Sequence, residues 1–173
     1  MNNKIAIDMR YVESPYSGLS RFSINIFKNL IKNTNDQELI FVIFLPPIYL
    51  TKHLDDFLRI CKKNVKFIYS KNKRGLKWKI PFFIFDLSIY KVLKKENVSI
   101  FVSPYIDPPY LPGIKVISTI HDLIFLNIDN YFNNFKKIKR FFSELRIIMT
   151  LIYSNHLLTV SKTSKELLIR RYK

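Results

Sequence analysis

The chain has 173 residues, of which 48% are hydrophobic and only 3 are glycine and 8 proline, so it can form one domain with a buried core and is not a disordered tail. Its 29 Lys and Arg outnumber its 13 Asp and Glu, for a net charge of +16, which favours anionic partners unless the excess is a compositional drift shared across a proteome. The single cysteine, Cys61, excludes a disulfide framework and a cysteine-based metal site.

The apolar stretches are too short or too interrupted to direct the chain into or across a membrane. The N-terminal stretch is broken by Asp8, so it lacks the apolar core of a signal peptide. Residues 39–50 and 80–90 are shorter than a membrane span and are interrupted by proline or aspartate. We therefore expect a cytoplasmic protein without a transmembrane helix.

Apolar runs of strand length alternate with segments of helical spacing along the chain. After Gly18, the residues Phe22, Ile26 and Leu30 recur at the spacing of an amphipathic helix. Other runs are continuously apolar and rich in β-branched and aromatic residues, as strands covered on both faces should be. In chain order we expect a strand at residues 4–9, a helix at 18–33, strands at 38–45 and 65–69, a helix between 81 and 97, strands at 98–103 and 114–120, a helix within 135–153, a strand at 156–160 and a final helix.

This alternation predicts one α/β domain over residues 1–173, a Rossmann-like, doubly wound parallel sheet with helices on both faces. The final helix can be capped by Ser161 or by Thr163, which has Glu166 at capping-box spacing. Ligands of such sheets bind outside the carboxyl ends of the strands. The loop at Gly18, the proline-rich residues 104–113, His121 and Ser161 each follow a strand, so we expect all of them at one edge of the sheet.

The loop before the first helix is a candidate anion site. Gly18 allows a ligand to approach the backbone closely, and the free N–H groups of the following helix favour a phosphate. The loop has neither the GxGxxG pattern nor a Walker lysine, which disfavours a nicotinamide cofactor and a P-loop. An ordinary tight turn remains the alternative.

His121 and Asp122 interrupt an apolar run directly after the strand at 114–120. A neutral imidazole can donate a hydrogen bond to a substrate oxygen, and a neighbouring carboxylate can orient the ring. A purely structural strand end is the alternative reading. We interpret His53 and His156 as structural.

Two basic clusters, residues 71–79 and 136–140, could contact an anionic membrane surface, and the first includes Trp78 as an aromatic anchor. They could also contact nucleic-acid phosphates, although the chain has no known nucleic-acid-binding motif. The remaining alternative is a solvated surface. No metal-ligand spacing and no nucleophile elbow is visible.

Five motifs, in order and spread over nearly the whole chain, resemble the N-terminal half of GT-B-fold glycosyltransferases of family 4, which use nucleotide-sugars with retention of configuration. Members of that family typically have similar motifs, such as IAIDAR, TGIGRY, HDL and TVSxxSKxxL. Here the motifs read IAIDMR, SGLSRF, SPYIDPPYLP, STIHDLIFL and LLTVSKTSKELLIRRY.

The resemblance implies an acceptor-side domain facing a second domain that carries most nucleotide-sugar contacts. It implies that His121 contacts the donor sugar near the reacting carbon, with Asp122 as a second catalytic candidate. It also implies a substrate-binding role for the loop near the donor diphosphate and for a tyrosine after a mid-chain strand; these residues are Ser17, Gly18, Leu19, Arg21 and Tyr105. The nucleotide-sugar is a co-substrate, and the family requires no cofactor or metal.

The sequence departs from the family pattern at two positions and in its extent. Val102 stands where many relatives have a histidine, and Ser20 stands where the second glycine of the loop is usual. We expect the donor-binding domain to be absent and the chain to be inactive unless a separately encoded donor half joins it.

We therefore expect transfer of a sugar to a glycan or lipid-linked acceptor in envelope polysaccharide biosynthesis, with peripheral contact to an anionic membrane and no specific nucleic acid. The alternative is a non-catalytic basic module that binds anionic lipid or nucleic acid on a transferase-like fold. A gene fragment without a function of its own is the third interpretation.

Overall fold

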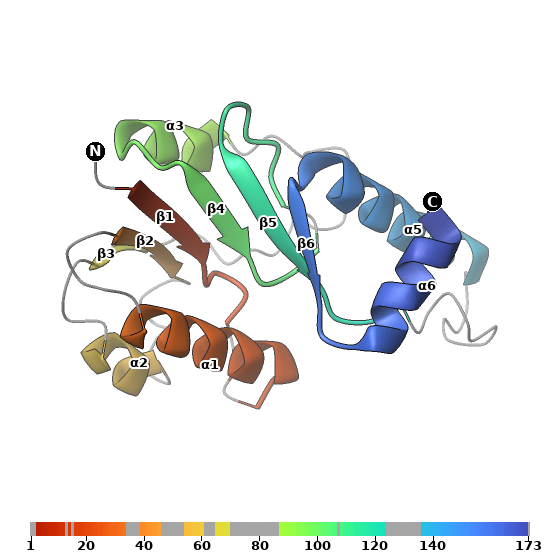
Figure 1. The fold of residues 1–173 in the computed structure, drawn as a ribbon, viewed down its shortest axis with the longest axis horizontal. Helices are drawn as coiled ribbons and strands as arrows, with labels where there is room; N and C mark the ends of the chain where they lie inside the picture. Colours follow the sequence, from red (N-terminus) through yellow and green to blue (C-terminus); the bar gives the residue numbers. More distant parts are fainter. Residues whose placement is uncertain are drawn as a thin grey trace.

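Six parallel strands form a single sheet in the computed structural model, which describes residues 3–12, 14, 16–33, 39–45, 54–60, 65–69, 87–106, 108–123 and 136–172. The order across the sheet is β3-β2-β1-β4-β5-β6 (Figure 1). The strands are β1 (Asn3–Asp8), β2 (Leu39–Leu45), β3 (Val65–Tyr69), β4 (Ile100–Ser103), β5 (Lys115–Ile120) and β6 (His156–Thr159). All six predicted strands are confirmed.

Five helices occur in the described part of the chain. They are α1 (Gly18–Lys32), α2 (Asp55–Ile60), α3 (Leu87–Lys95), α5 (Lys136–Tyr153) and α6 (Lys162–Tyr172). The helix predicted between 81 and 97 is confirmed for its described residues. The basic segment 71–79 and His53 lie outside the described residues, so their predicted roles stay predictions.

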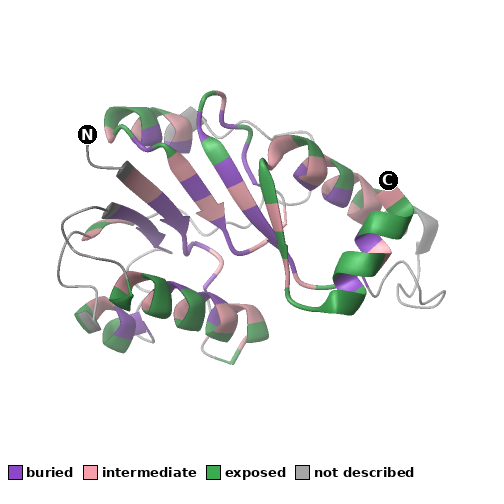
Figure 2. Ribbon diagram, viewed as in Figure 1, coloured by how far each residue is buried: buried purple, intermediate pink, exposed green. Residues whose placement is uncertain are grey.

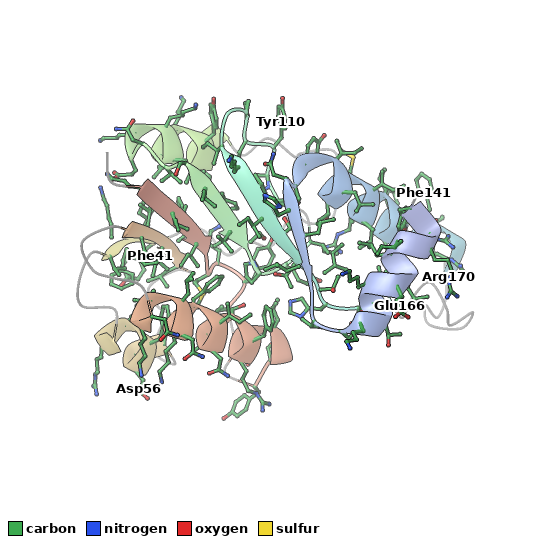
Figure 3. All side chains as sticks on the ribbon, in the orientation of Figure 1. Phe41, Asp56, Tyr110, Phe141, Glu166 and Arg170 are labelled. Carbon is green, nitrogen blue, oxygen red and sulfur yellow. The ribbon has the colours of Figure 1, made fainter. Side chains whose placement is uncertain are left out.

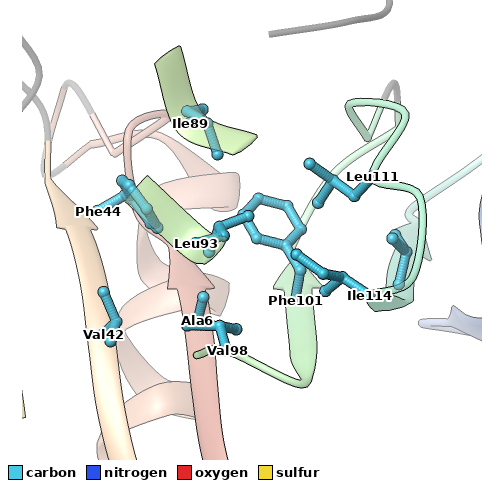
Figure 4. Packing of buried hydrophobic residues seen from close by; sticks show 10 residues of the cluster. Ala6, Val42, Phe44, Ile89, Leu93, Val98, Phe101, Leu111 and Ile114 are labelled. Atoms are coloured by element: carbon cyan, nitrogen blue, oxygen red, sulfur yellow. The ribbon is translucent and has the colours of Figure 1, made fainter. Parts of the chain in front are cut away.

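Helices cover both faces of the central strands. Neighbouring side chains on a strand point to opposite faces, and in β1 the residue Ile7 packs in one cluster with Phe27 of α1, whereas Ala6 packs in another with Leu93 of α3. Figure 4 shows the second cluster, in which Phe101 of β4 lies beside Leu93. The predicted Rossmann-like α/β fold is confirmed.

The last strand and the last two helices form a third buried cluster, which includes Ile120 of β5, Ile147 of α5 and Leu168 of α6. Ile120 lies on the same face of β5 as Val116, which packs with α3, so α5 covers the face that α3 covers. β6 is an edge strand of the described sheet, and Leu158 on it is exposed. The residues of β6 are exposed or half-buried throughout (Figure 2).

The strand order reverses beside β1. The chain leaves β1 through α1 and builds β2 and β3 on one side, whereas β4 pairs with the other side of β1. Ligands of open α/β sheets bind outside the carboxyl ends of the two strands at such a reversal. Here these are the ends of β1 at Asp8 and of β4 at Ser103.

The structure decides which residue caps α6. The Ser164 backbone N–H donates to the Ser161 hydroxyl oxygen at 3.0 Å, the bond that an N-cap accepts from the third helical residue. Thr163 lies inside α6. The alternative cap at Thr163 is therefore wrong, and Ser161 fills that role.

Candidate functional site

The loops at the carboxyl ends of β1, β4, β5 and β6 meet around His121. Its Nε2 lies 2.7 Å from the carbonyl oxygen of Pro104, which follows β4. Its ring meets the Phe22 ring of α1 edge-on, with centroids 4.6 Å apart. The Ser164 hydroxyl, in α6 after β6, donates to the backbone oxygen of His121 at 3.4 Å. The segments predicted to share one edge of the sheet therefore do so.

The contact with Pro104 determines which nitrogen of His121 carries hydrogen. A carbonyl oxygen can only accept, so Nε2 must be the donor. In the neutral ring Nδ1 is then an acceptor, and it donates only when the imidazole is charged. Half-buried His121 is thus suited to accept a hydrogen bond from a ligand hydroxyl through Nδ1.

Asp122 is exposed, whereas Leu123 beyond it is buried. Because adjacent side chains of an extended segment turn to opposite sides, Asp122 and His121 do not act as one unit by adjacency alone. The catalytic role of Asp122 stays a prediction.

Tyr105 joins a row of aromatic and cationic side chains beside His121. Its ring centroid lies 5.2 Å from that of Tyr11, after β1, and 6.4 Å from that of His121. The Arg146 guanidinium of α5 lies 5.8 Å from the Tyr105 ring centroid, in the range of a cation–π contact. Tyr105 therefore connects the loop after β1, the end of β5 and α5 at the carboxyl edge of the sheet, which we refer to as the rim.

The N-terminus of α1 forms the other part of the rim. Ser17 is its N-cap residue but makes no capping hydrogen bond with its side chain, and the first turn holds no acidic residue. A methyl group added at Gly18 would meet nothing within 4 Å. There is thus open space beside Gly18, and an anion bound there would be stabilised by the free N–H groups of the helix terminus.

The remaining candidates of the loop differ in exposure. Arg21 is exposed and donates to the backbone oxygen of Tyr16 at 3.4 Å, while Leu19 is half-buried. Ser20 is fully buried, and its hydroxyl has no hydrogen-bond partner among the described residues. Of the predicted residues, Arg21 is the one cation beside the α1 terminus.

A buried ion pair fixes the end of β1. The Arg10 side chain donates to both carboxylate oxygens of Asp8, each at 2.8 Å, and the Arg10 backbone N–H donates to the same carboxylate at 3.1 Å. Asp8 is fully buried and Arg10 nearly so. Such bidentate pairs have a fixed geometry, so this one holds the loop that leads to Tyr11.

Sequence reasoning missed three residues of this rim, namely Tyr11, Phe22 and Arg146. Tyr11 follows the first strand, so the rule that ligands bind at carboxyl ends could have identified it. Phe22 was interpreted only as part of a helix stripe. Arg146 lies in the middle of α5, and no sequence signal places it beside Tyr105.

Among the described residues, no group of three or more His, Cys, Asp or Glu could hold a metal ion. Within the same part of the chain, no helix is long and apolar enough to cross a membrane.

Neither a known protein family nor a curated protein matches this chain. The Rossmann-like fold is therefore established by the sheet itself, and the likeness to glycosyltransferases rests on the motifs of the sequence.

Proposed function

We propose that this chain is the acceptor-side half of a retaining GT-B glycosyltransferase, which transfers a sugar from a nucleotide-sugar to a glycan or lipid-linked acceptor in envelope polysaccharide biosynthesis. The observation that carries the proposal is the position of His121, which contacts Phe22 of α1 and the Pro104 carbonyl at the carboxyl edge of the sheet. The enzyme acts at the cytosolic face of a membrane, in peripheral contact with it.

The donor diphosphate lies against the N-terminus of α1 in this proposal. The backbone N–H groups of Gly18, Leu19 and Ser20 precede the first helical hydrogen bond, which Arg21 donates to the Ser17 oxygen at 3.1 Å. These N–H groups and the Arg21 guanidinium stabilise the charge of a leaving diphosphate without a metal.

The donor sugar lies beside His121. Since Nε2 donates to Pro104, the neutral ring accepts a sugar hydroxyl at Nδ1, and this bond orients the sugar. Tyr105, packed against Tyr11, forms the neighbouring wall of the site. A donor-binding domain opposite this one supplies the remaining nucleotide contacts, and residues 1–173 alone do not transfer sugar.

A titration of the isotope-labelled chain with inorganic pyrophosphate, and then with UDP-glucose, tests the anion site. The amide signals of Gly18, Leu19 and Ser20 should shift in the two-dimensional NMR spectrum. Arg21→Gln should weaken pyrophosphate binding about three- to tenfold, as expected when a charged contact is lost.

The matched control is Arg59→Gln, which removes one exposed cation from α2. If both variants weaken binding equally, or if the α1 amides do not shift, the anion site is wrong. Sugar transfer by purified residues 1–173 alone would contradict the requirement for a donor-binding domain.

The second candidate, a basic module without catalysis, is favoured by the net charge of +16. It predicts tight, salt-dependent binding to duplex DNA of arbitrary sequence and no response to UDP-glucose. The glycosyltransferase proposal predicts a response to UDP-glucose and no tight binding to duplex DNA.

A further inference from the structure

Helix α5 exposes apolar side chains along one side. Phe141 and Ile152 are 60% and 66% exposed, and three further apolar residues of this helix are exposed as well. At 3.6 residues per turn these five positions share one side of the helix. They are Ile138, Phe141, Phe142, Ile148 and Ile152, and we refer to them as the α5 apolar face.

The α5 apolar face is exposed in addition to a buried apolar side of the same helix, on which Ile147 packs in the third buried cluster. A helix at the surface of a globular domain turns its apolar side to the core and its polar side to water. In α5 the fully buried Thr150 and half-buried Ser143 and Arg146 lie away from the apolar face. Isolated exposed apolar residues are common, but a continuous patch of this kind marks a contact surface.

Exposed cations lie on α6, which packs against α5 in the third buried cluster. In α6 the side chains of Lys162, Lys165 and Arg170 are exposed, and the chain as a whole carries a net charge of +16. Figure 3 shows Phe141 of α5 and Arg170 of α6 at the same end of the molecule. A partner that is apolar in its interior and negatively charged at its margin would fit this surface.

We infer that the α5 apolar face lies in the surface of an anionic membrane, parallel to the bilayer plane. Interfacial helices insert aromatic and aliphatic side chains below the headgroups while flanking Lys and Arg contact anionic lipid. A second copy of the chain fits this surface less well, because pairing the same face would bring two strongly basic helix pairs together.

This contact would place the candidate site close to the membrane. Arg146, on the inward side of α5, contacts Tyr105 at the rim, so the helix that lies on the lipid also borders the site. The α5 apolar face is thus the surface that makes the peripheral membrane contact. Its link to a lipid-linked acceptor rests on the proposed function. Vesicle binding and pyrophosphate binding are separate measurements, so either can fail without the other.

Sedimentation with vesicles tests the inference. We compare vesicles of phosphatidylcholine with vesicles that also contain phosphatidylglycerol. The chain should bind the anionic vesicles strongly and the neutral ones weakly, and high salt should reduce binding. The double variant Phe141→Ser/Ile152→Ser should lower the partition coefficient at least about tenfold, since each side chain loses the gain of burial in lipid.

The matched control is Ile26→Ser/Leu30→Ser, which removes two exposed apolar side chains from α1 and should leave vesicle binding unchanged. All four positions are exposed, so circular dichroism and thermal melting should show folded proteins. Equal losses in both double variants, or equal binding to neutral and anionic vesicles, would overturn the inference.

A second copy as the partner would give a different result. The chain would then dimerise in sedimentation velocity, Phe141→Ser/Ile152→Ser would restore the monomer, and anionic vesicles would not bind. Replacing two exposed cations of α6, Lys165→Gln/Arg170→Gln, should lower binding to anionic vesicles several-fold. No change in this variant would contradict the role of charge.

Discussion

His121 illustrates how a backbone contact determines the chemistry of a side chain. The sequence suggests an imidazole that donates to substrate, whereas the 2.7 Å contact between Nε2 and the Pro104 oxygen occupies that donor in the neutral ring. The neutral ring is therefore better suited to accept a hydrogen bond from a substrate hydroxyl, at Nδ1, than to donate one.

This assignment predicts the tautomer of His121. A long-range proton–nitrogen NMR spectrum recorded well above neutral pH should show hydrogen on Nε2 and an unprotonated Nδ1. The remaining histidines serve as internal references in the same spectrum. The opposite tautomer would mean that the ring is flipped and that Nε2 does not donate to Pro104.

At the scale of elements, the start of α6 is coupled to the candidate site. Ser161 caps the helix through the Ser164 N–H, and the Ser164 hydroxyl contacts the backbone oxygen of His121. The cap thus stabilises a helix whose first turn holds the segment containing His121.

Replacing the cap should destabilise the protein measurably. Ser161→Ala should lower the free energy of unfolding by about 1 kcal/mol, the typical effect of losing a serine N-cap. Thr163→Ala should change it by less than about 0.5 kcal/mol, because Thr163 is exposed within the helix. Urea denaturation measures both, and a larger loss in the Thr163 variant would show that Thr163 is the cap.

At the scale of the whole molecule, Glu96 connects three parts of the fold at the opposite, amino-terminal edge of the sheet. It follows α3 and pairs with Lys66 of β3, and its second oxygen lies 3.9 Å from Lys4 of β1. The hydrogen bond from Lys66, together with the charges of Lys66, Lys4 and Lys95, holds the pKa of Glu96 below its usual value of 4.5.

A carboxylate whose pKa is lower in the folded protein than in the unfolded chain stabilises the folded state at pH values above the unfolded-chain pKa. This stabilisation is lost as the pH falls through the pKa of the folded state. Glu96→Gln should therefore be less stable than the original protein above about pH 5, by up to about 1 kcal/mol. The difference should vanish as Glu96 becomes protonated in strong acid. Thermal melting from neutral to strongly acidic pH measures it.

Glu166→Gln is the control for this experiment, since it removes an exposed carboxylate from α6 and keeps the contact with Lys66. If the melting temperature of Glu96→Gln equals that of the original protein at every pH, the pair of Glu96 and Lys66 does not stabilise the fold.

The sequence predicted the elements closely because the strands are short runs rich in apolar and β-branched residues. β3 matches its predicted range, residues 65–69, and β1 differs from its own by one residue at each end. In β2 the run is continuously apolar, as expected of a strand that is covered on both faces, and this local pattern does not depend on neighbouring strands. The carboxyl-edge rule then predicted the position of His121.

The sequence alone determined the fold class, the strand and helix segments, and the edge of the sheet where the candidate residues lie, because these follow from local periodicity and chain order. Only the tertiary structure decided the strand order, the contacts of His121 with Phe22 and Pro104, and the approach of Arg146 to Tyr105. It also decided which apolar side chains of α5 are buried, such as Ile147, and which are exposed, such as Phe141 and Ile152. Periodicity assigns residues to the sides of a helix, but which side is buried depends on the elements that pack against it.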